Sequence, residues 1–359
     1  MAAKVFGDLN ESAFPSAAGV RLPGRGVPSI LGFFPPTIRG ALSRLPAAVW
    51  QTAEEIRLRA RRPLTIAAFD RDLWVTPQGT LATNPGAALQ PSAEDIATAL
   101  QLMCQGSIYA REEELRGGFL TLAGGYRVGI AGHVVADEGM VKTIHPVSSL
   151  AVRLPREIPG LARSILPFLL TPARGDGRYF LSTLIISRPR GGKTTMLRDL
   201  VRLLSSGDPP GGWPGARVAL IDERSEVACS DLGVPQCDVG WRTDVLDACP
   251  KAAGLMLAIR TLAPQIVATD EIGTLQDVAA IQEAAVAGVS VLATAHASTR
   301  GELLRRPGLG QLVADGVFQR LVIISRRHGP GTVEAVLDEQ GEALFSLEQA
   351  FMPDREAAL

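Results

Sequence analysis

The second half of the chain alternates between short apolar runs rich in β-branched residues and longer stretches with helical periodicity. The predicted strands are 181–186, 218–221, 266–269 and 289–293, and the predicted helices begin at Lys193 and cover 252–262 and 276–287. Strands separated by helices are typical of a parallel sheet, because a parallel pair needs a long crossover connection. We therefore predict an α/β domain in this half.

The first half has a mixed pattern instead. A helical stretch at Ala93–Cys104 is followed by two runs, Gly118–Leu122 and Tyr126–Ile130, which flank a Gly-rich turn. Two short strands joined by such a turn form a hairpin. The prediction for this half is a smaller α+β domain.

The order of these patterns predicts two domains with a leader and a tail. A chain of 359 residues exceeds the usual size of a single hydrophobic core. Residues 1–30 are rich in Gly, Pro, Ala and Ser, and we expect a loosely ordered leader there. A Pro- and Gly-containing joint at 170–177 marks the boundary, so the domains are predicted at 31–172 and 173–350, with a tail at 351–359.

Composition narrows the class of partner. The chain has 36 Lys and Arg against 37 Asp and Glu, a formal net charge of -1, which argues against a nucleic acid or an anionic lipid surface as partner. The N-terminus lacks the apolar stretch of a signal peptide, and no uninterrupted run of about 18 apolar residues predicts a membrane helix. We expect a cytoplasmic protein.

The cysteines and histidines do not predict a metal centre. The cysteines lack the close paired spacing of a zinc site, and the four histidines are scattered along the chain. We expect reduced, mostly buried thiols at Cys104, Cys229, Cys237 and Cys249.

A phosphate-binding loop is predicted between the first strand and the first helix of the α/β half. The Walker A pattern is Gly, any four residues, Gly, Lys, and Ser or Thr. The corresponding nucleotide-binding candidates are Ser187, Arg188, Pro189, Arg190, Gly191, Gly192, Lys193, Thr194 and the following Thr195. The glycines would let backbone N–H groups face phosphate oxygens, Lys193 would neutralise the β- and γ-phosphates, and Thr194 would supply a hydroxyl to Mg²⁺. The predicted activity is Mg-dependent hydrolysis of ATP.

The predicted loop departs from the pattern at its first position. Ser187 stands where the first glycine belongs, and it would be strained if that position required a positive φ. Arg188 and Arg190 add charge that could contact nucleotide or a neighbouring subunit, or could simply be solvated. We expect these departures to affect nucleotide affinity and turnover.

Two acid pairs compete for the second half of the site. Asp270 and Glu271 end one predicted strand, and Asp222 and Glu223 end another. Acids at the carboxyl edge of a parallel sheet face the phosphate crevice. We assign the Walker B role to the later pair because the strand that follows it ends in polar residues suited to sensing a γ-phosphate. Asp270 would then hold Mg²⁺, usually through water, and Glu271 would orient and polarise the attacking water.

Other polar residues are candidates for contact with the γ-phosphate. Thr294 or His296, at the end of the next strand, could sense it. Arg224, Arg242 and Arg260 could stabilise charge in the transition state, from the same subunit or from a neighbour. Sequence does not rank these arginines, and we take Arg242 as the catalytic candidate.

Several motifs together resemble the stage III sporulation protein AA family over about Leu31–Leu347. The motifs that carry the resemblance are Asp222-Glu223-Arg224-Ser225-Glu226, Gly240–Asp247, Cys249-Pro250-Lys251, Asp270-Glu271-Ile272-Gly273 and, upstream, Glu54–Arg59, Tyr109–Gly118 and Gly124–Gly132. The second half is also similar, more distantly, to the motor ATPases of type II and type IV secretion and pilus systems. In that comparison the three motifs known as the Asp box, Walker B and the His box fall at Asp222-Glu223, Asp270-Glu271 and Thr294–His296.

The resemblance implies a P-loop NTPase of the RecA/AAA-like kind with a smaller N-terminal α+β domain. It also implies a hexameric ring in the mother cell of an endospore-forming bacterium, peripheral to the cytoplasmic face of a membrane channel or secretion-like complex. With the reasoning from the residues, the catalytic candidates are Glu271, Lys193, His296, Glu223 and Arg242, and the candidate metal ligands are Thr194 and Asp270.

Three functions are consistent with these residues. The first is a motor or assembly ATPase of a secretion-like complex needed for endospore formation. The second is a nucleotide-dependent scaffold with negligible turnover, for which Ser187 is the supporting feature. The third is a nucleic-acid-stimulated ATPase, against which the near-neutral charge argues.

Overall fold

The chain divides into two units in the computed structural model, which describes residues 29–347 except 69–70, 105–110, 138–139, 156, 173–176, 209–211 and 232. The N-terminal unit comprises 29–157 together with 229–237, and the C-terminal unit comprises 158–228 and 238–347. The tail predicted at 351–359, and all but the end of the leader predicted at 1–30, lie outside the described residues.

The N-terminal unit is built on a seven-stranded antiparallel sheet, with strand order β4-β3-β2-β1-β7-β6-β5 in its described part. Its strands are β1 (Ala53–Arg59), β2 (Thr65–Ala68), β3 (Arg71–Val75), β4 (Leu81–Ala82), β5 (Phe119–Leu122), β6 (Tyr126–Asp137) and β7 (Met140–Arg153). Its α-helices are α1 (Pro36–Ser43), α2 (Ala47–Thr52), α3 (Ala93–Met103) and α4 (Glu112–Arg116). These helices and the sheet give the α+β class that the sequence predicts.

Local sequence explains two of these elements. The predicted hairpin is confirmed, because β5 and β6 pair with Leu122 opposite Tyr126 across the Gly124-Gly125 turn. The helix α3 begins at a capping box, in which Ser92 and Asp95 satisfy each other's backbone N–H groups. Its apolar face then packs into the core of this unit.

The C-terminal unit contains an eight-stranded sheet in the described residues, with order β10-β9-β11-β12-β8-β13-β14-β15. The strands are β8 (Thr183–Ser187), β9 (Val218–Asp222), β10 (Thr243–Asp247), β11 (Ile266–Thr269), β12 (Ser290–His296), β13 (Arg320–Ser325), β14 (Thr332–Asp338) and β15 (Ala343–Ser346). The first six are mutually parallel, and β14 and β15 extend the sheet antiparallel. The carboxyl ends of the parallel strands therefore share one edge of the sheet.

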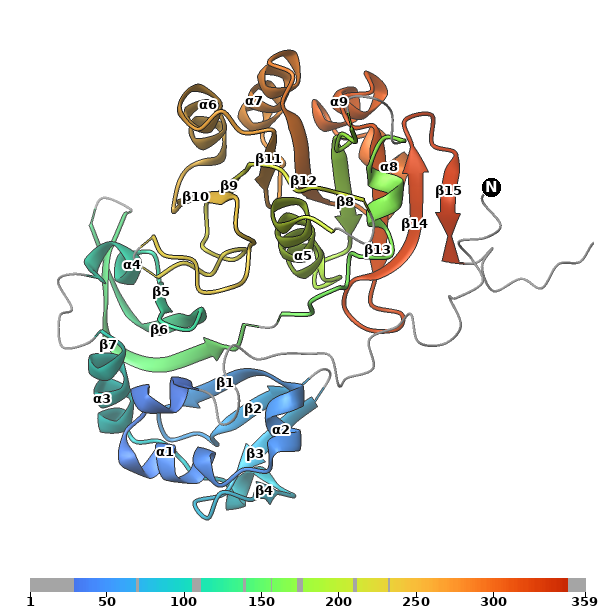
Figure 1. Cartoon of the computed structure of the whole chain (residues 1–359). Helices are drawn as coiled ribbons and strands as arrows, with labels where there is room; N and C mark the ends of the chain where they lie inside the picture. The colour runs from blue at the N-terminus through green and yellow to red at the C-terminus, as the bar shows by residue number, and fades with distance from the viewer. Residues whose placement is uncertain are drawn as a thin grey trace, which may run out of the picture. The chain divides into compact units, whose positions relative to one another are not determined.

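Helices cover both faces of this sheet (Figure 1). Successive strand residues point to opposite faces, so Ile185 joins one core and Ile186 the other. The first core contains the apolar side of α5 (Lys193–Ser206), and the second contains residues of α6 (Lys251–Thr261), α7 (Leu275–Val286) and α9 (Leu309–Ala314). A short helix, α8 (Arg300–Leu304), precedes α9. Burial on both faces explains the nearly continuous apolar runs that predicted a parallel sheet.

The boundary between the units lies earlier than the joint near Pro172 that the sequence predicts. The units divide between Glu157 and Ile158. Residues just after the division, including Ile165 and Leu169, are buried in the same core as α5. The Pro- and Gly-containing joint falls within the C-terminal unit, because Leu169 before it and Phe180 after it belong to one core.

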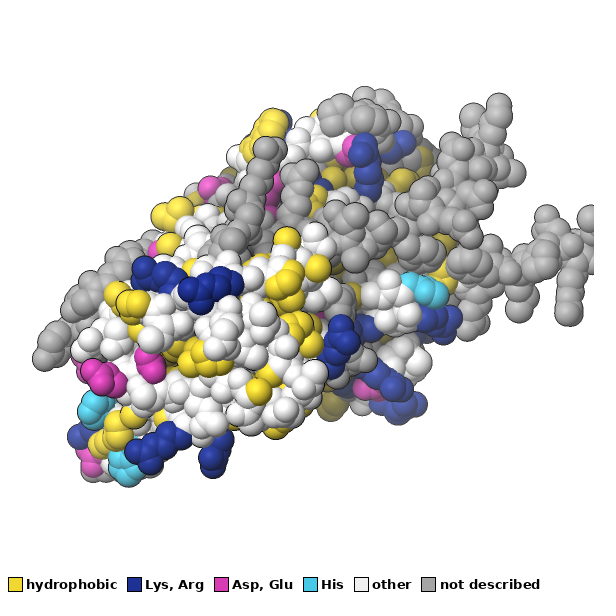
Figure 2. All heavy atoms as spheres, turned by 90° about the horizontal axis from the view of Figure 1, so that it is seen from below, with side chains coloured by type: hydrophobic (Ala, Val, Ile, Leu, Met, Phe, Trp, Pro, Cys, Tyr) yellow, Lys and Arg dark blue, Asp and Glu magenta, His cyan; other side chains and the backbone are white. Residues whose placement is uncertain are grey.

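Figure 2 shows one face of the molecule, on which Lys and Arg side chains lie in separate small groups among apolar and uncharged surface. Among the residues that the structure describes, no helix combines the length and hydrophobicity needed to cross a membrane.

Candidate active site

The predicted phosphate loop connects the carboxyl end of β8 to the first turn of α5. Gly192 precedes the helix with a φ of 97°, a conformation that favours glycine. A Cβ at Gly192 would come within 2.4 Å of the Gly331 nitrogen. The Gly331 N–H in turn donates to the Gly191 carbonyl at 2.9 Å. The backbone is therefore folded tightly at a helix N-terminus, and this cradle fits a phosphate group.

Ser187 fits this loop without the strain considered from the sequence. It is the last residue of β8, buried, and pairs with His296 in parallel register. Its hydroxyl donates to the Arg188 carbonyl at 2.7 Å. Positive φ values occur at Arg190 and Gly192 instead. Serine is tolerated at the first position because this position is extended strand backbone.

Oxygen ligands suited to Mg²⁺ meet beside the loop. Thr194, in the first turn of α5, donates its hydroxyl to Asp270 at 2.7 Å. Thr294, fully buried in β12, donates to the other carboxylate oxygen of Asp270. Asp270 follows β11, so three separate elements place a hydroxyl and a carboxylate together. This donor set fits Mg²⁺, which prefers oxygen ligands.

A hydrogen-bonded row runs from the loop lysine to the second Walker B acid. Lys193 Nζ lies 3.0 Å from His296 Nδ1, and His296 Nε2 lies 2.8 Å from Glu271 Oε1. An ammonium can only donate, so we assign the imidazole as neutral, with Nδ1 accepting from Lys193 and Nε2–H donating to Glu271. His296 therefore positions both charged groups.

Glu271 adopts an unusual backbone conformation. Its φ is 51°, in the left-handed region, where a residue other than glycine is strained. Its N–H donates to the Thr294 hydroxyl at 2.8 Å, and the next N–H, of Ile272, donates to the Thr294 carbonyl at 2.8 Å. These two bonds to β12 hold the strained turn. The turn directs the Glu271 carboxylate toward the sheet edge where Lys193 lies.

Burial lowers the pKa of Lys193, whereas the charges of Asp270 and Glu271 raise it in part. The side chain is almost fully buried, with a relative exposure of 7%. A buried cation at the N-terminus of a helix favours an anionic ligand. The loop therefore has both the backbone geometry and the charge for binding phosphate.

The other acid pair has a different setting. Asp222 is buried at the end of β9 and accepts the backbone N–H groups of Glu226, Val227 and Ala228 at 2.8–2.9 Å. Burial raises its pKa to about 6, against the lowering effect of these three hydrogen bonds. Asp222 thus stabilises the loop that follows β9, which we call the Asp222 loop and define as 223–228.

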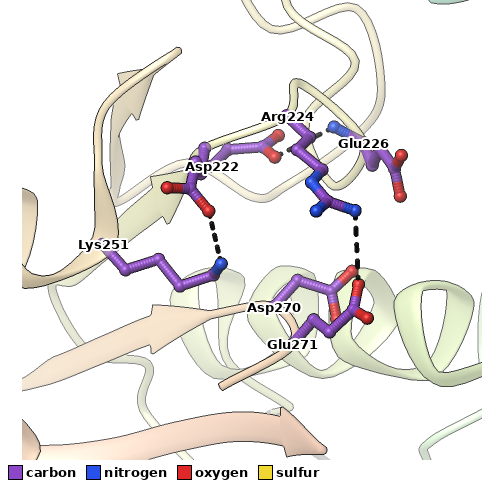
Figure 3. Close-up of a pocket in the computed structure, with 7 residues that line it drawn as sticks. Asp222, Arg224, Glu226, Lys251, Asp270 and Glu271 are labelled. Carbon is purple, nitrogen blue, oxygen red and sulfur yellow. Dashed lines mark hydrogen bonds and ion pairs between the residues drawn. The ribbon is translucent and has the colours of Figure 1, made fainter. Parts of the chain in front are cut away.

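The Asp222 loop carries two charged side chains to the candidate site. Glu223 forms an ion pair at 2.5 Å with Lys251, which is the first residue of α6. Arg224 lies 3.6 Å from Glu271, and Figure 3 shows it reaching toward the end of β11. These residues line one pocket together with Asp222, Glu226 and Asp270. The two acid pairs therefore belong to one site.

The three candidate arginines occupy different places. Arg224 contacts the site, as described. Arg242 donates to the Ser205 carbonyl at 2.7 Å. Ser205 lies at the C-terminal end of the 14-residue helix α5, and Lys193 lies at its start, so about 18 Å of helix separates the two ends. Arg260 is exposed in the last turn of α6. Within one subunit, the structure brings only Arg224 of these three to Glu271.

The remaining loop residues are peripheral. Arg188, Pro189 and Arg190 are exposed, and Arg188 donates to the Ser298 hydroxyl at 3.0 Å. Thr195 lies in the first turn of α5.

Lys251 was missed as a site residue. It occurs in the Cys-Pro-Lys motif that contributed to the family resemblance, but a lysine at the start of a helix has no catalytic signature. Its side chain is only 12% exposed and is paired with Glu223. Only the packing of α6 beside β9 makes its position apparent.

Taken together, a phosphate loop, the Thr194–Asp270 contact and a second strand-end glutamate match the parts of a P-loop NTPase fold and form a candidate site. The chain belongs to the family described as sporulation stage III, protein AA, which matches residues 30–344. Stage III sporulation protein AA of Bacillus subtilis is 39% identical over 310 residues, which cover 86% of this chain and 94% of that protein. The predicted family resemblance is confirmed.

Solved structures with a similar fold include two bacterial ATPases. The Legionella pneumophila ATPase DotB has a TM-score of 0.52 at 15% identity, covering 82% of this chain and 78% of that one. The Yersinia pseudotuberculosis ATPase DotB has a TM-score of 0.51 at 15% identity, covering 82% and 76%. This likeness confirms the predicted fold class.

Proposed function

We propose that this chain is a Mg-dependent ATPase that acts in endospore formation. The observation that carries the proposal is the contact between the Thr194 hydroxyl and Asp270, beside a phosphate loop whose lysine is buried. Phosphate cradle, metal ligands and a strand-end glutamate are the parts that phosphoryl transfer to water requires. Membership of the sporulation family supports the biological setting.

Each residue has a role that follows from its position. The backbone around Gly191 and Gly192 would bind the phosphates, and Lys193 would neutralise their charge. Thr194 and Asp270 would hold Mg²⁺. A bound Mg²⁺ would screen the charge that develops on the phosphate oxygens.

Glu271 is the proposed base that orients the attacking water. Its carboxylate is 42% exposed, so water can reach it, and His296 holds one of its oxygens. Arg224 is the proposed cation for transition-state charge within the same subunit, because it already lies near Glu271. Arg242 keeps a catalytic role only as a residue contributed by a neighbouring subunit. Glu223, paired with Lys251, would have a supporting electrostatic role.

The finer parts of the proposal concern assembly. We propose a homo-hexameric ring in the cytoplasm of the mother cell, peripheral to a membrane channel or secretion-like complex that it drives or assembles. The fold shared with the DotB ATPases, the family's sporulation setting and the motif resemblance to secretion and pilus motors support this proposal.

The test is phosphate release measured against protein concentration for the wild type and Lys193→Ala. We expect Mg-dependent release that rises more steeply than in proportion to concentration and is reduced to background in the variant. Lys142→Ala is the matched control, because Lys142 is an exposed lysine on the N-terminal sheet, and it should retain the wild-type rate. Equal background rates in the wild type and Lys193→Ala would refute the enzymatic proposal.

Two further outcomes would replace the motor by another function. Nucleotide binding without phosphate release from an assembled ring would establish a nucleotide-dependent scaffold. A rate that increases on addition of DNA or RNA would establish a nucleic-acid-stimulated ATPase, although the separate groups of basic side chains in Figure 2 do not form a continuous basic track on that face.

A further inference from the structure

The segment 229–237 belongs to the N-terminal unit although the C-terminal unit flanks it in sequence. It follows directly after the Asp222 loop, which carries Glu223 and Arg224. The chain therefore leaves the C-terminal unit after Ala228, is built into the N-terminal unit, and returns at Asp238. We call 229–237 the inserted segment.

A buried arginine of the N-terminal unit holds the inserted segment. Arg111 Nη2 donates to Asp231 Oδ1 at 2.9 Å, and its side chain is only 8% exposed. Its Nη1 donates to Glu114 at 2.9 Å and to the Thr121 carbonyl at 3.0 Å. Burial alone would lower the pKa of Arg111, but its bonds to both carboxylates raise it above the ordinary value. The arginine thus joins α4 and β5 to the inserted segment by charge-assisted hydrogen bonds.

The turn between β5 and β6 also contacts the inserted segment. The Gly124 N–H donates to Gln236 Oε1 at 3.0 Å. A Cβ at Gly125 would lie 2.8 Å from the Cys229 Cβ, so the backbone approaches more closely than an alanine would allow. Arg111 and the hairpin turn therefore contact the segment near both of its ends.

Residues of the C-terminal unit hold the Asp222 loop, which precedes the inserted segment. Asp222 accepts three of its backbone N–H groups. Arg198, a buried residue of α5, donates to the Val227 carbonyl at 2.5 Å and to the Glu226 carbonyl at 2.7 Å. These bonds hold residues 226–228, which connect Arg224 to the inserted segment along the chain.

We propose that the Arg111–Asp231 ion pair is a positioning clamp, which orders the Asp222 loop and so sets Arg224 against Glu271. Both residues of the clamp lie within the N-terminal unit, and the clamp acts on the Asp222 loop through the chain that joins Asp231 to Ala228. Its effect on hydrolysis rests on the proposed ATPase function, whereas its effect on loop order does not. Arg111 and Asp231 are positioning residues, since neither contacts the reacting groups.

The structure offers a matched pair of variants. Asp231→Asn removes the charge that holds the segment, but leaves Arg111 paired with Glu114 and the Thr121 carbonyl. Glu114→Gln removes the other charge from the same arginine, together with one of the two oxygens that accept from Arg111 and from the Thr121 N–H, and leaves the Asp231 bond in place. Both changes are nearly isosteric, so a difference between them reports on the clamp and not on the burial of Arg111.

The first measurement is backbone hydrogen exchange of the full-length protein. The amides of Glu226, Val227 and Ala228 are the reporters, because Asp222 protects them. We expect about tenfold faster exchange at these amides in Asp231→Asn, the factor expected when Arg111 loses the carboxylate charge of its partner, and wild-type exchange in Glu114→Gln. Exchange within β11 should be unchanged in both variants. Unchanged exchange at the reporters in Asp231→Asn would overturn the clamp.

The second measurement is steady-state phosphate release by the same proteins. Misplacing Arg224 should lower kcat about tenfold in Asp231→Asn and leave KM within about twofold, whereas Glu114→Gln should keep both values. Faster exchange with an unchanged kcat, in an active wild type, would overturn the link to catalysis. If the wild type releases no phosphate, the proposed ATPase function fails, and the exchange result still decides the clamp.

Discussion

Two strands of the C-terminal sheet, β9 and β11, lead into the same dipeptide, Asp-Glu. The two acid pairs nevertheless have different surroundings. Asp270 accepts hydroxyl groups of Thr194 and Thr294, which places it beside the phosphate loop as a candidate metal ligand. Asp222 accepts three backbone N–H groups and is buried by the loop that it folds. The same residue type is therefore a candidate for chemistry at one strand end and a structural anchor at the next.

The two glutamates differ in a corresponding way. Glu271 faces His296, Lys193 and Arg224 at an exposed turn with a strained φ. Glu223 is neutralised by one lysine of α6. Strand order explains the difference: β11 lies nearer to β8, from which the phosphate loop begins, than β9 does, so Glu271 and not Glu223 lies beside the loop.

The largest expected effect separates the two glutamates. Glu271→Gln should lower kcat for ATP hydrolysis by about 10²–10⁴-fold, the range for loss of a general base, because the amide cannot accept a proton from water. Glu223→Gln should lower it by no more than about tenfold, since that carboxylate has a supporting role. Phosphate release under saturating ATP and Mg²⁺ checks both values. A larger loss in Glu223→Gln than in Glu271→Gln would reverse the assignment of the two pairs.

Replacing each of the two aspartates should have a different effect on the free energy of unfolding. Asp222→Ala leaves three buried N–H groups without their acceptor, at about 1–3 kcal/mol each, so the free energy of unfolding should fall by about 3 kcal/mol or more. Asp270→Ala should lower it by less, about 1–3 kcal/mol, because Thr194 can turn toward solvent and only the buried Thr294 hydroxyl loses its acceptor, yet it should abolish Mg-dependent hydrolysis. Urea unfolding and phosphate release measure the two effects. Similar losses of stability in both variants would contradict the contrast.

The ionisation of Asp222 should make the free energy of unfolding depend on pH. Its pKa is raised from 3.8 to about 6, so between these pH values the native state holds this proton more tightly than the unfolded state. The associated stability is fully present below about pH 4 and is lost as pH rises through 6, by about 3 kcal/mol at 1.36 kcal/mol per pH unit.

Asp222→Asn cannot titrate, and it supplies the comparison for this prediction. Urea unfolding between pH 4 and pH 7 should show a steeper fall of the unfolding free energy in the wild type than in the variant. Parallel curves for the two proteins would mean that Asp222 is ionised throughout this range.

Local patterns predicted much of the fold. Apolar runs located β8, β9, β11 and β12 to within a few residues, because strands buried on both faces are almost entirely apolar. The edge strand β10 was not predicted, since none of its five residues is fully buried and two of them are aspartates. Its pairing with β9 depends on backbone hydrogen bonds that leave no hydrophobic pattern.

The site was predicted unevenly. Lys193, Thr194, Asp270, Glu271 and His296 were selected from their places at strand and helix ends, and the structure brings them together. Arg242 was selected on residue type alone, and it lies at the far end of α5. Lys251 and the Arg111–Asp231 pair join residues distant in sequence, so no local spacing could indicate them.

The sequence by itself determined the phosphate loop, the strand-end acids and the family, because each depends on residues that are close along the chain. Only the tertiary structure decided which arginine reaches Glu271, that Asp222 is a structural anchor, and that 229–237 is built into the N-terminal unit. The physical reason is that ion pairs and buried hydrogen bonds depend on distances in space, which strand order and packing set and local sequence does not.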